Sequence, residues 1–301
     1  MNQVRSMLRS AYAALPFKKP IFELVRRHVR LPERVYQHLH FEAPITIPVR
    51  DGCTFAMHHF GAQVENDLFW AGYGNGWEAT SLRLWARLAA VSNTIFDIGA
   101  NTGAYALAAK AVNEKARVFA FEPVASISGR LRNNIELNGF DITVVQAGVS
   151  SSTGEAVMYI PATEHSYSAS LNSSMLSGNG NLIETVIPTL RMDEFVKDRA
   201  LDSADLFKID TEKHEVDVLS GFGDVIERFK PAVLIEILNK TLGGEVEAFF
   251  ANSNYVFYEI VEGEALRRVE SLGVASRNYL LCTADFAARN GFGDVVLHEA
   301  L

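Results

Sequence analysis

The residues best suited to bind a ligand form a glycine-rich turn, DIGANTG, at positions 97–103. The turn follows an apolar strand-like run and precedes an alanine-rich helical one. Gly99 allows a sharp turn and a close ligand because it lacks a Cβ, and free N–H groups at the helix start can bind polar atoms. The spacing is not the Gly-x-Gly-x-x-Gly of pyrophosphate sites, and Asp97 adds negative charge. The turn therefore favours a cationic ligand over a diphosphate.

Glu122 is a second candidate ligand-binding residue. It stands 19 positions after Gly103, at the end of the next strand-like run, RVFAFEP. A carboxylate at that point can accept both hydroxyls of a ribose. Glycines and solvated acidic residues often follow strands in α/β proteins, but the two features at this spacing favour a cofactor site. A cation with a ribose and no phosphate indicates S-adenosylmethionine, which we expect as the cofactor.

A further group of polar residues, Asp210, Glu212 and His214, stands at the end of the apolar run LFKID. In methyl transfer to an alcohol a positioned base helps, because an alcohol that keeps its proton is a poor nucleophile. His214 titrates near neutral pH and is the candidate base, while Asp210 would orient it or touch the cofactor. The alternatives are a solvent-facing His214 and an Asp210 that caps the next helix.

The same residues could instead bind a metal ion. Asp210, Glu212, His214 and Glu236 offer oxygen and imidazole ligands of the kind that a hard cation takes. Carboxylates at strand ends, however, more often hydrogen-bond to the backbone or to a ligand. We therefore expect no metal in this site.

A polar stretch rich in serine and asparagine lies between Pro161 and Leu182. Loops of this length in compact domains usually have a function. His165 and Tyr167 within it carry groups suited to a sugar, and Glu236 is a further candidate for contact with the acceptor. A solvated loop is the competing interpretation.

A parallel sheet must position these groups. From residue 94 onward, short apolar runs alternate with helical stretches, a pattern typical of parallel strands buried on both faces. Ligands bind such sheets at the carboxyl ends of the strands, where the polar groups stand. The sequence predicts an α/β fold with a mostly parallel seven-stranded sheet and helices on both faces. The predicted strands are 94–99, 117–123, 142–149, 206–210, 232–238, 255–260 and 278–283.

The first 90 residues have a different pattern. Residues 1–40 are mostly helical in pattern, and Asp51-Gly52 between two β-type runs predicts a tight hairpin. We expect residues 1–90 to form a helical and β-hairpin segment that caps the active end of the sheet. Residues 91–301 would then form the S-adenosylmethionine-dependent methyltransferase domain.

The composition excludes several classes of protein. Hydrophobic residues make up 48% of the 301, which is too many for a disordered chain. The net charge of −8 argues against a dedicated nucleic-acid binder. Cys53 and Cys282 fit neither a disulfide framework nor a zinc site and favour a reduced, cytoplasmic protein. No apolar run is long enough to span a membrane, although the basic N-terminal segment could contact one peripherally.

Five ordered motifs resemble the FkbM family of S-adenosylmethionine-dependent methyltransferases. They are FDIGANTGAYAL, VFAFEP, LRNNIELN, FKIDTEKHEVDVLSGF and PAVLIEIL. The resemblance implies a class I, Rossmann-like methyltransferase fold and, most often, O-methylation of a sugar or another hydroxyl. It places Glu122 on the ribose of the cofactor. It places four turn residues on the methionine side, namely Asp97, Gly99, Asn101 and Gly103.

Lys213 departs from the pattern of that family. The family usually has a glycine directly after the Asp-x-Glu that residues 210–212 form here. A lysine at this position is expected to change the shape of the active-site mouth.

The sequence as a whole favours an O-methyltransferase acting on a saccharide, glycolipid or related small molecule by in-line displacement with a general base. A nicotinamide-dependent oxidoreductase is disfavoured by the missing third glycine and by Asp97 beside the phosphate position. A non-catalytic S-adenosylmethionine-binding module is disfavoured because both Asp97 and Glu122 are present. We expect a small-molecule or glycan acceptor and no nucleic-acid partner.

Overall fold

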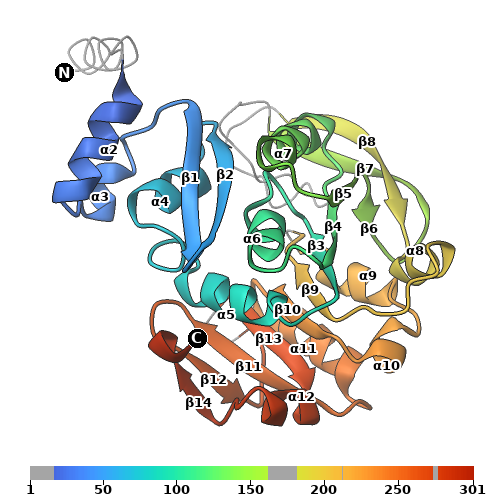
Figure 1. Ribbon diagram of the computed structural model, residues 1–301. Helices are drawn as coiled ribbons and strands as arrows, with labels where there is room; N and C mark the ends of the chain where they lie inside the picture. The colour runs from blue at the N-terminus through green and yellow to red at the C-terminus, as the bar shows by residue number, and fades with distance from the viewer. Residues whose placement is uncertain (1–16, 162–181, 212, 274–276) are drawn as a thin grey trace.

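A nine-stranded mixed sheet runs through the middle of the protein (Figure 1). The computed structural model describes residues 17–161, 182–211, 213–273 and 277–301. The five strands from β10 to β5 run parallel to one another. In spatial order the nine strands are β14 (Val295–Leu297), β12 (Ala265–Val269), β11 (Tyr255–Val261), β13 (Asn278–Thr283), β10 (Ala232–Glu236), β9 (Leu206–Ile209), β3 (Thr94–Ile98), β4 (Arg117–Phe121) and β5 (Ile142–Val145).

Seven of these strands correspond to the seven predicted runs, and the α/β fold is confirmed, but the run 142–149 is divided between β5 and a short strand of a second sheet, Gly148–Val149. Among the seven, β13 runs antiparallel to both of its neighbours, β10 and β11. The strands β12 and β14 extend the sheet beyond the prediction. Their sequences, such as ALRRV in β12, are only partly buried. The apolar pattern of a strand buried on both faces is therefore missing from them.

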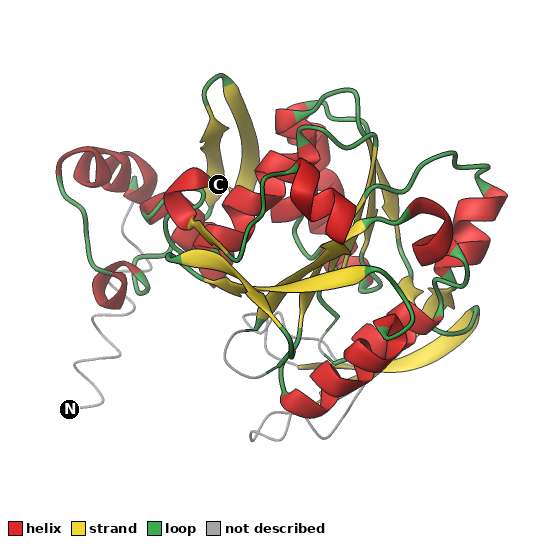
Figure 2. Ribbon diagram, turned by 90° about the horizontal axis from the view of Figure 1, so that it is seen from below, coloured by secondary structure: helices red, strands yellow, loops and turns green. Residues whose placement is uncertain are grey.

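Alternate residues along the central strands face two separate cores. Ile95 and Leu206 belong to the first core, whereas the adjacent Phe96 and Phe207 belong to the second. Figure 2 shows helices on both sides of the sheet. The first core includes residues of α5 (Ala79–Ala89), α6 (Ala104–Val112), α7 (Ala125–Asn138) and α12 (Ala284–Arg289). The second includes residues of α8 (Met192–Asp198), α9 (Glu215–Ser220), α10 (Val225–Phe229) and α11 (Lys240–Phe250).

The predicted hairpin around Asp51-Gly52 is formed by β1 (Ala43–Arg50) and β2 (Cys53–His59). Two asparagines of the LRNNIELN motif in α7 hold it. Asn134 Oδ1 accepts a hydrogen bond from His58 N at 2.8 Å, and Asn138 Oδ1 accepts one from Ala56 N at 2.6 Å. The helices beside the hairpin are α2 (Lys18–His28), α3 (Glu33–Tyr36) and α4 (Gln63–Trp70).

A smaller three-stranded sheet has the order β6 (Gly148–Val149), β8 (Leu182–Leu190) and β7 (Gly154–Pro161). Its residues Met158 and Ile187 pack against Val124 and Ile127, which lie after β4 and in α7. This sheet therefore stands beside the carboxyl end of β4. The chain ends in a short 3-10 helix, η2 (His298–Ala300).

We predict that Gly99→Ala lowers the free energy of unfolding by about 3 kcal/mol or more. A Cβ there would lie 1.9 Å from the Asp210 carbonyl oxygen, and the φ of Gly99 is +84°. Gly139→Ala is the matched control, because φ is +63° and the added Cβ meets nothing within 4 Å. It should lose about 1 kcal/mol, from backbone strain alone. Equal losses in urea denaturation would show that Gly99 is not tightly packed.

Candidate active site

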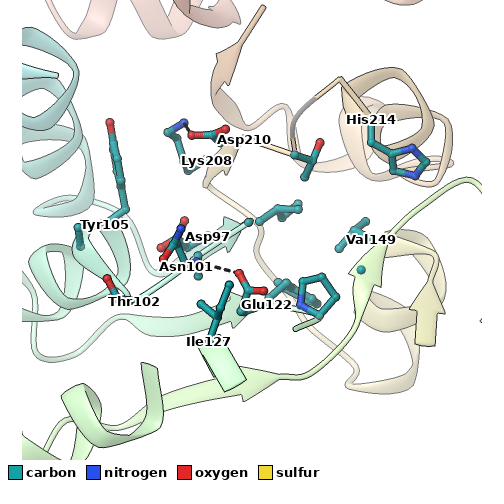
Figure 3. Close-up of a pocket in the computed structure, with 18 of the residues that line it drawn as sticks. Asp97, Asn101, Thr102, Tyr105, Glu122, Ile127, Val149, Lys208, Asp210 and His214 are labelled. Carbon is teal, nitrogen blue, oxygen red and sulfur yellow. Dashed lines mark hydrogen bonds and ion pairs between the residues drawn. The ribbon is translucent and has the colours of Figure 1, made fainter. Parts of the chain in front are cut away.

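A pocket opens at the carboxyl ends of β3, β4 and β9 (Figure 3). It encloses about 1090 Å³ of space, including its open mouth. One side is polar and is lined by residues 97–102, Glu122, Lys208 and Asp210. The other side is mainly apolar and is lined by Ile127, Val149, Met158 and Ile187.

The glycine-rich turn is held between two strand ends. Gly99 N and Ala100 N donate hydrogen bonds to the Phe121 carbonyl oxygen at 3.0 and 2.9 Å. Asp210 N donates to the Ile98 carbonyl oxygen at 3.0 Å. The positive φ of Gly99 and its contact with Asp210 leave no room for a side chain. The turn and Asp210 therefore face the same pocket.

Gly103 has a packing role and does not line the pocket. A Cβ at this position would lie 2.5 Å from Leu131 Cδ1, so the glycine lets the start of α6 approach α7. Asn101, in contrast, lines the pocket. The four turn residues singled out from the sequence thus divide into Asp97, Gly99 and Asn101, which face the pocket, and Gly103, which supports it.

Glu122 closes the turn from the side of β4. Its Oε2 accepts a hydrogen bond from Asn101 N at 3.1 Å, and its Oε1 accepts one from Val124 N at 2.9 Å. The side chain is 6% exposed. Burial raises the pKa of Glu122 to about 7, although the two backbone donors oppose this. Glu122 therefore changes its charge close to neutral pH.

Asp97 lies deeper, at the base of the pocket. Its Oδ2 accepts a hydrogen bond from Ala106 N, in the first turn of α6, at 2.9 Å. Burial raises the pKa of Asp97 to about 7, while Lys208 lowers it. One of the two carboxylate oxygens thus satisfies a helix N–H group that has no partner within the helix.

Lys208 is the main site residue that the sequence reasoning missed. Its Nζ lies 3.2 Å from Asp210 Oδ2 and 5.1 Å from the centre of the Tyr105 ring, and the side chain is 1% exposed. In the sheet register it pairs with Asp97. Burial alone would lower the pKa of Lys208, but the acidic groups around it raise it. The sequence does carry a signal for this residue, because a lysine stands inside an otherwise apolar central strand, two residues before an aspartate.

The carboxylates of Glu78 and Glu236 also raise the pKa of Lys208. Glu78 accepts hydrogen bonds from the Tyr105 hydroxyl and, at 3.0 Å, from Asn278 Nδ2. Glu236 ends β10, on the sheet face that Leu234 shares with the first core. Neither glutamate lines the pocket. The predicted contact of Glu236 with the acceptor stays a prediction.

His214 lies across the pocket from Lys208 (Figure 3). Its Nδ1 is 3.1 Å from Asp217 Oδ2, and its Nε2 is 3.0 Å from Ser150 Oγ. Burial lowers the pKa of His214, and Asp217 opposes this. Because α9 begins at Glu215, His214 is the residue before the helix rather than part of a first turn. Asp210 is therefore not the residue that precedes this helix.

Lys213 has a φ of +74°, a conformation that glycine adopts far more easily. A glycine at this position would adopt such a φ without strain. The buried Glu215 holds the loop, because its Oε1 accepts hydrogen bonds from Lys213 N and Thr211 N, both at 3.1 Å. Glu215 therefore acts as a loop support.

Three candidate residues, Glu212, His165 and Tyr167, lie outside the described residues, and their roles stay predictions. Within the described ranges, no group of three or more His, Cys, Asp or Glu side chains could hold a metal ion. Asp97, Asp210, His214 and Glu122 are brought together around one pocket.

The strand order, the glycine-rich turn and the pocket at the strand ends define a class I, Rossmann-like methyltransferase fold. A family model described as "Methyltransferase FkbM domain" matches residues 97–257, more than half of the chain. The chain therefore belongs to the FkbM methyltransferase family, as the resemblance implied.

This chain is similar to two curated proteins and to a solved structure, each over part of its length. Hexuronic acid methyltransferase AglP of Haloferax volcanii is 29% identical over 53% of this chain and 62% of its own length. AMB antimetabolite synthetase AmbE of Pseudomonas aeruginosa is 26% identical over 50% of this chain and 8% of its own. The chain thus spans less than two thirds of either relative. The crystal structure of methyltransferase FkbM from Methylobacillus flagellatus KT aligns with a TM-score of 0.40 and 16% identity, covering 64% of this chain and 43% of that one.

We predict that Lys208→Met lowers the free energy of unfolding at pH 7.5 by about 3–5 kcal/mol, because buried carboxylates lose their counter-ion. The loss should be smaller at pH 5.5, where Asp97, with a pKa raised to about 7, is protonated. Lys110→Met is the control, since this buried lysine donates to the Ala116 carbonyl oxygen and should lose about 1 kcal/mol. A loss for Lys208→Met that is the same at both pH values would contradict the electrostatic role.

Proposed function

We propose that this chain is an S-adenosylmethionine-dependent O-methyltransferase that acts on a hydroxyl of a saccharide, glycolipid or related small molecule. The observation that carries the proposal is the convergence of a pocket-lining glycine turn, Glu122 and Asp210 on a single pocket. In this proposal residues 91–301 form the catalytic domain and residues 1–90 an attached N-terminal segment.

The residues present suit this cofactor. Among the described residues that line the pocket, the carboxylates Asp97, Glu122 and Asp210 outnumber the lysine, Lys208. Such a surface favours a positively charged ligand. An ionised carboxylate has about four lone-pair sites. Backbone N–H groups use two of those on Glu122, which leaves acceptors for the two hydroxyls of a ribose.

The chemistry that S-adenosylmethionine supplies when bound is an electrophilic methyl group on a sulfonium. The chain must position an acceptor hydroxyl and take its proton. Figure 3 places His214 on the opposite side of the pocket from Lys208 and Asp210. The polar side with its acidic groups therefore suits the cofactor, and the side of His214 suits the acceptor.

His214 has the hydrogen bonds of a general base. Asp217 Oδ2 at 3.1 Å accepts the proton on Nδ1, which leaves the lone pair of Nε2 as the basic site. Ser151 Oγ donates to the other oxygen of Asp217 at 3.1 Å and holds the carboxylate in place. The Ser150 hydroxyl lies 3.0 Å from Nε2, so the acceptor hydroxyl would have to replace this contact to give its proton to Nε2. A carboxylate behind the ring stabilises the imidazolium that forms.

A saccharide acceptor is supported by the similarity to a protein named hexuronic acid methyltransferase, which covers just over half of this chain. We propose that His165 and Tyr167 contribute contacts to such an acceptor. A panel of hydroxylated acceptors, assayed for methyl transfer from labelled S-adenosylmethionine, tests the proposal. Transfer to sugar hydroxyls supports it, and transfer to nitrogen or carbon acceptors alone would refute the O-directed assignment.

We predict that Glu122→Gln weakens S-adenosylmethionine binding about tenfold or more, since a charge-assisted contact is lost. For the parent protein, affinity should fall between pH 8 and pH 6 as Glu122, with a pKa raised to about 7, becomes protonated. The variant should show a shallower pH dependence in calorimetry. Glu136→Gln, on the exposed face of α7, is the control and should bind normally. Unchanged affinity in a folded Glu122→Gln protein would show that Glu122 does not bind the ribose of the cofactor.

We predict that His214→Ala lowers the methyl-transfer rate about 10²-fold with cofactor affinity intact. The parent rate should fall with acid as His214 gains a proton, at a pH below its ordinary pKa because burial lowers that pKa.

Asp217→Asn provides the discriminating variant. It removes the charge that raises the pKa of His214, so the acid limb of the rate profile should move to lower pH. His38→Ala, an exposed histidine outside the pocket, is the control and should leave rate and profile unchanged. A profile that does not move in Asp217→Asn would show that His214 is not the titrating base.

A further inference from the structure

Helix α2 presents an apolar stripe to solvent. Ile21 and Leu24 are 45% and 59% exposed, and their i, i+3 spacing places them on one side of the helix; Phe17, directly before the helix, is 77% exposed. Exposed apolar residues are ordinary when they are scattered, but a contiguous helical stripe of them indicates a contact surface. Figure 1 shows α2 and α3 at one edge of the molecule, beyond α4.

The opposite side of α2 is fixed to the rest of the protein. Phe22 is buried, with ring centroids 5.9 Å from Phe41 and 5.2 Å from Trp70. Arg26 donates to the Phe69 carbonyl oxygen and lies 4.4 Å above the Phe69 ring. Because these contacts anchor the inner side, the helix cannot rotate to bury its apolar stripe without breaking them.

The segment that carries this stripe is basic. Residues 17–34 contain six lysines and arginines and two glutamates, a net charge of +4. Up to residue 34 the chain carries a net charge of +6, whereas the remaining residues carry −14. Such asymmetry separates a basic segment from an acidic body and is typical of segments that bind an anionic surface.

We propose that α2 docks this protein on the surface of a membrane that contains anionic lipids. An apolar stripe flanked by arginine and lysine is the pattern of helices that lie in the interface of a bilayer. None of the described helices is long and apolar enough to cross a membrane. A second copy of the chain is a poorer occupant, because a two-fold contact would place the same basic residues against each other. The acidic body is repelled by anionic headgroups, so contact is confined to this edge.

Co-sedimentation of the full chain with lipid vesicles tests the proposal. We expect binding to vesicles of phosphatidylcholine with about 30% phosphatidylglycerol and little binding to phosphatidylcholine alone. Raising salt from about 0.1 M to 0.5 M should weaken binding, because the headgroup charges are screened. Absence of binding to the anionic vesicles at low salt would overturn the proposal.

Matched variants test which residues bind. Leu24→Gln should lower the partition coefficient severalfold, whereas Leu297→Gln, at a leucine 63% exposed on β14, should not. Arg27→Glu should lower it about tenfold or more, whereas Lys240→Glu, an equal charge change on the exposed start of α11, should not. Circular dichroism melting confirms that each variant is folded.

Two results would contradict membrane docking through α2. Equal losses in the control and α2 variants would show non-specific adsorption. Concentration-dependent dimers in sedimentation velocity that Leu24→Gln abolishes, with no vesicle binding, would assign the stripe to a second copy of the chain.

Discussion

The ammonium group of Lys208 attracts carboxylates from four separate segments of the chain. Asp97 lies next to the end of β3, Asp210 follows β9, Glu236 ends β10, and Glu78 precedes α5. Ionised carboxylates this deep in a protein repel one another and lose their hydration. One buried cation in the central strand reduces both costs. The strand ends that form the pocket can therefore remain acidic and close together.

The same arrangement limits what the pocket can bind. A lysine already paired at 3.2 Å with Asp210 is poorly available to a phosphate, and the remaining carboxylates repel anions. Burial also brings the pKa values of Asp97 and Glu122 to about 7, so a bound cation would favour their ionised forms. A cationic cofactor without phosphate is consistent with both properties. The separate basic edge at α2 does not disturb this pocket, because it lies beyond α4 (Figure 1).

Backbone geometry constrains the site as strongly as charge does. Gly99 is in contact with the Asp210 carbonyl oxygen, so the turn and the end of β9 move together. On the far side, the loop that carries His214 is held by Glu215 and contains Lys213 in a conformation that costs a non-glycine residue about 1 kcal/mol. The two sides of the pocket are thus positioned by the close contact at Gly99 and by the Glu215 carboxylate.

The sequence by itself determined seven strands of the large sheet and the glycine-rich turn that lines the pocket. Strands buried on both faces need continuous apolar runs, and a turn such as residues 97–103 needs glycine. Both features can therefore be predicted from the local sequence. What only the tertiary structure decided is how distant residues meet. In the sequence, Lys208 is a single lysine in an apolar run, and only the strand register shows that it lies opposite Asp97. Asp217 is a local neighbour of His214, three residues away, whereas Ser150, 64 residues before His214, became its partner only through packing of α9 beside β6. Contacts of this kind depend on chain segments far apart in sequence, whose spacing carries no local signal.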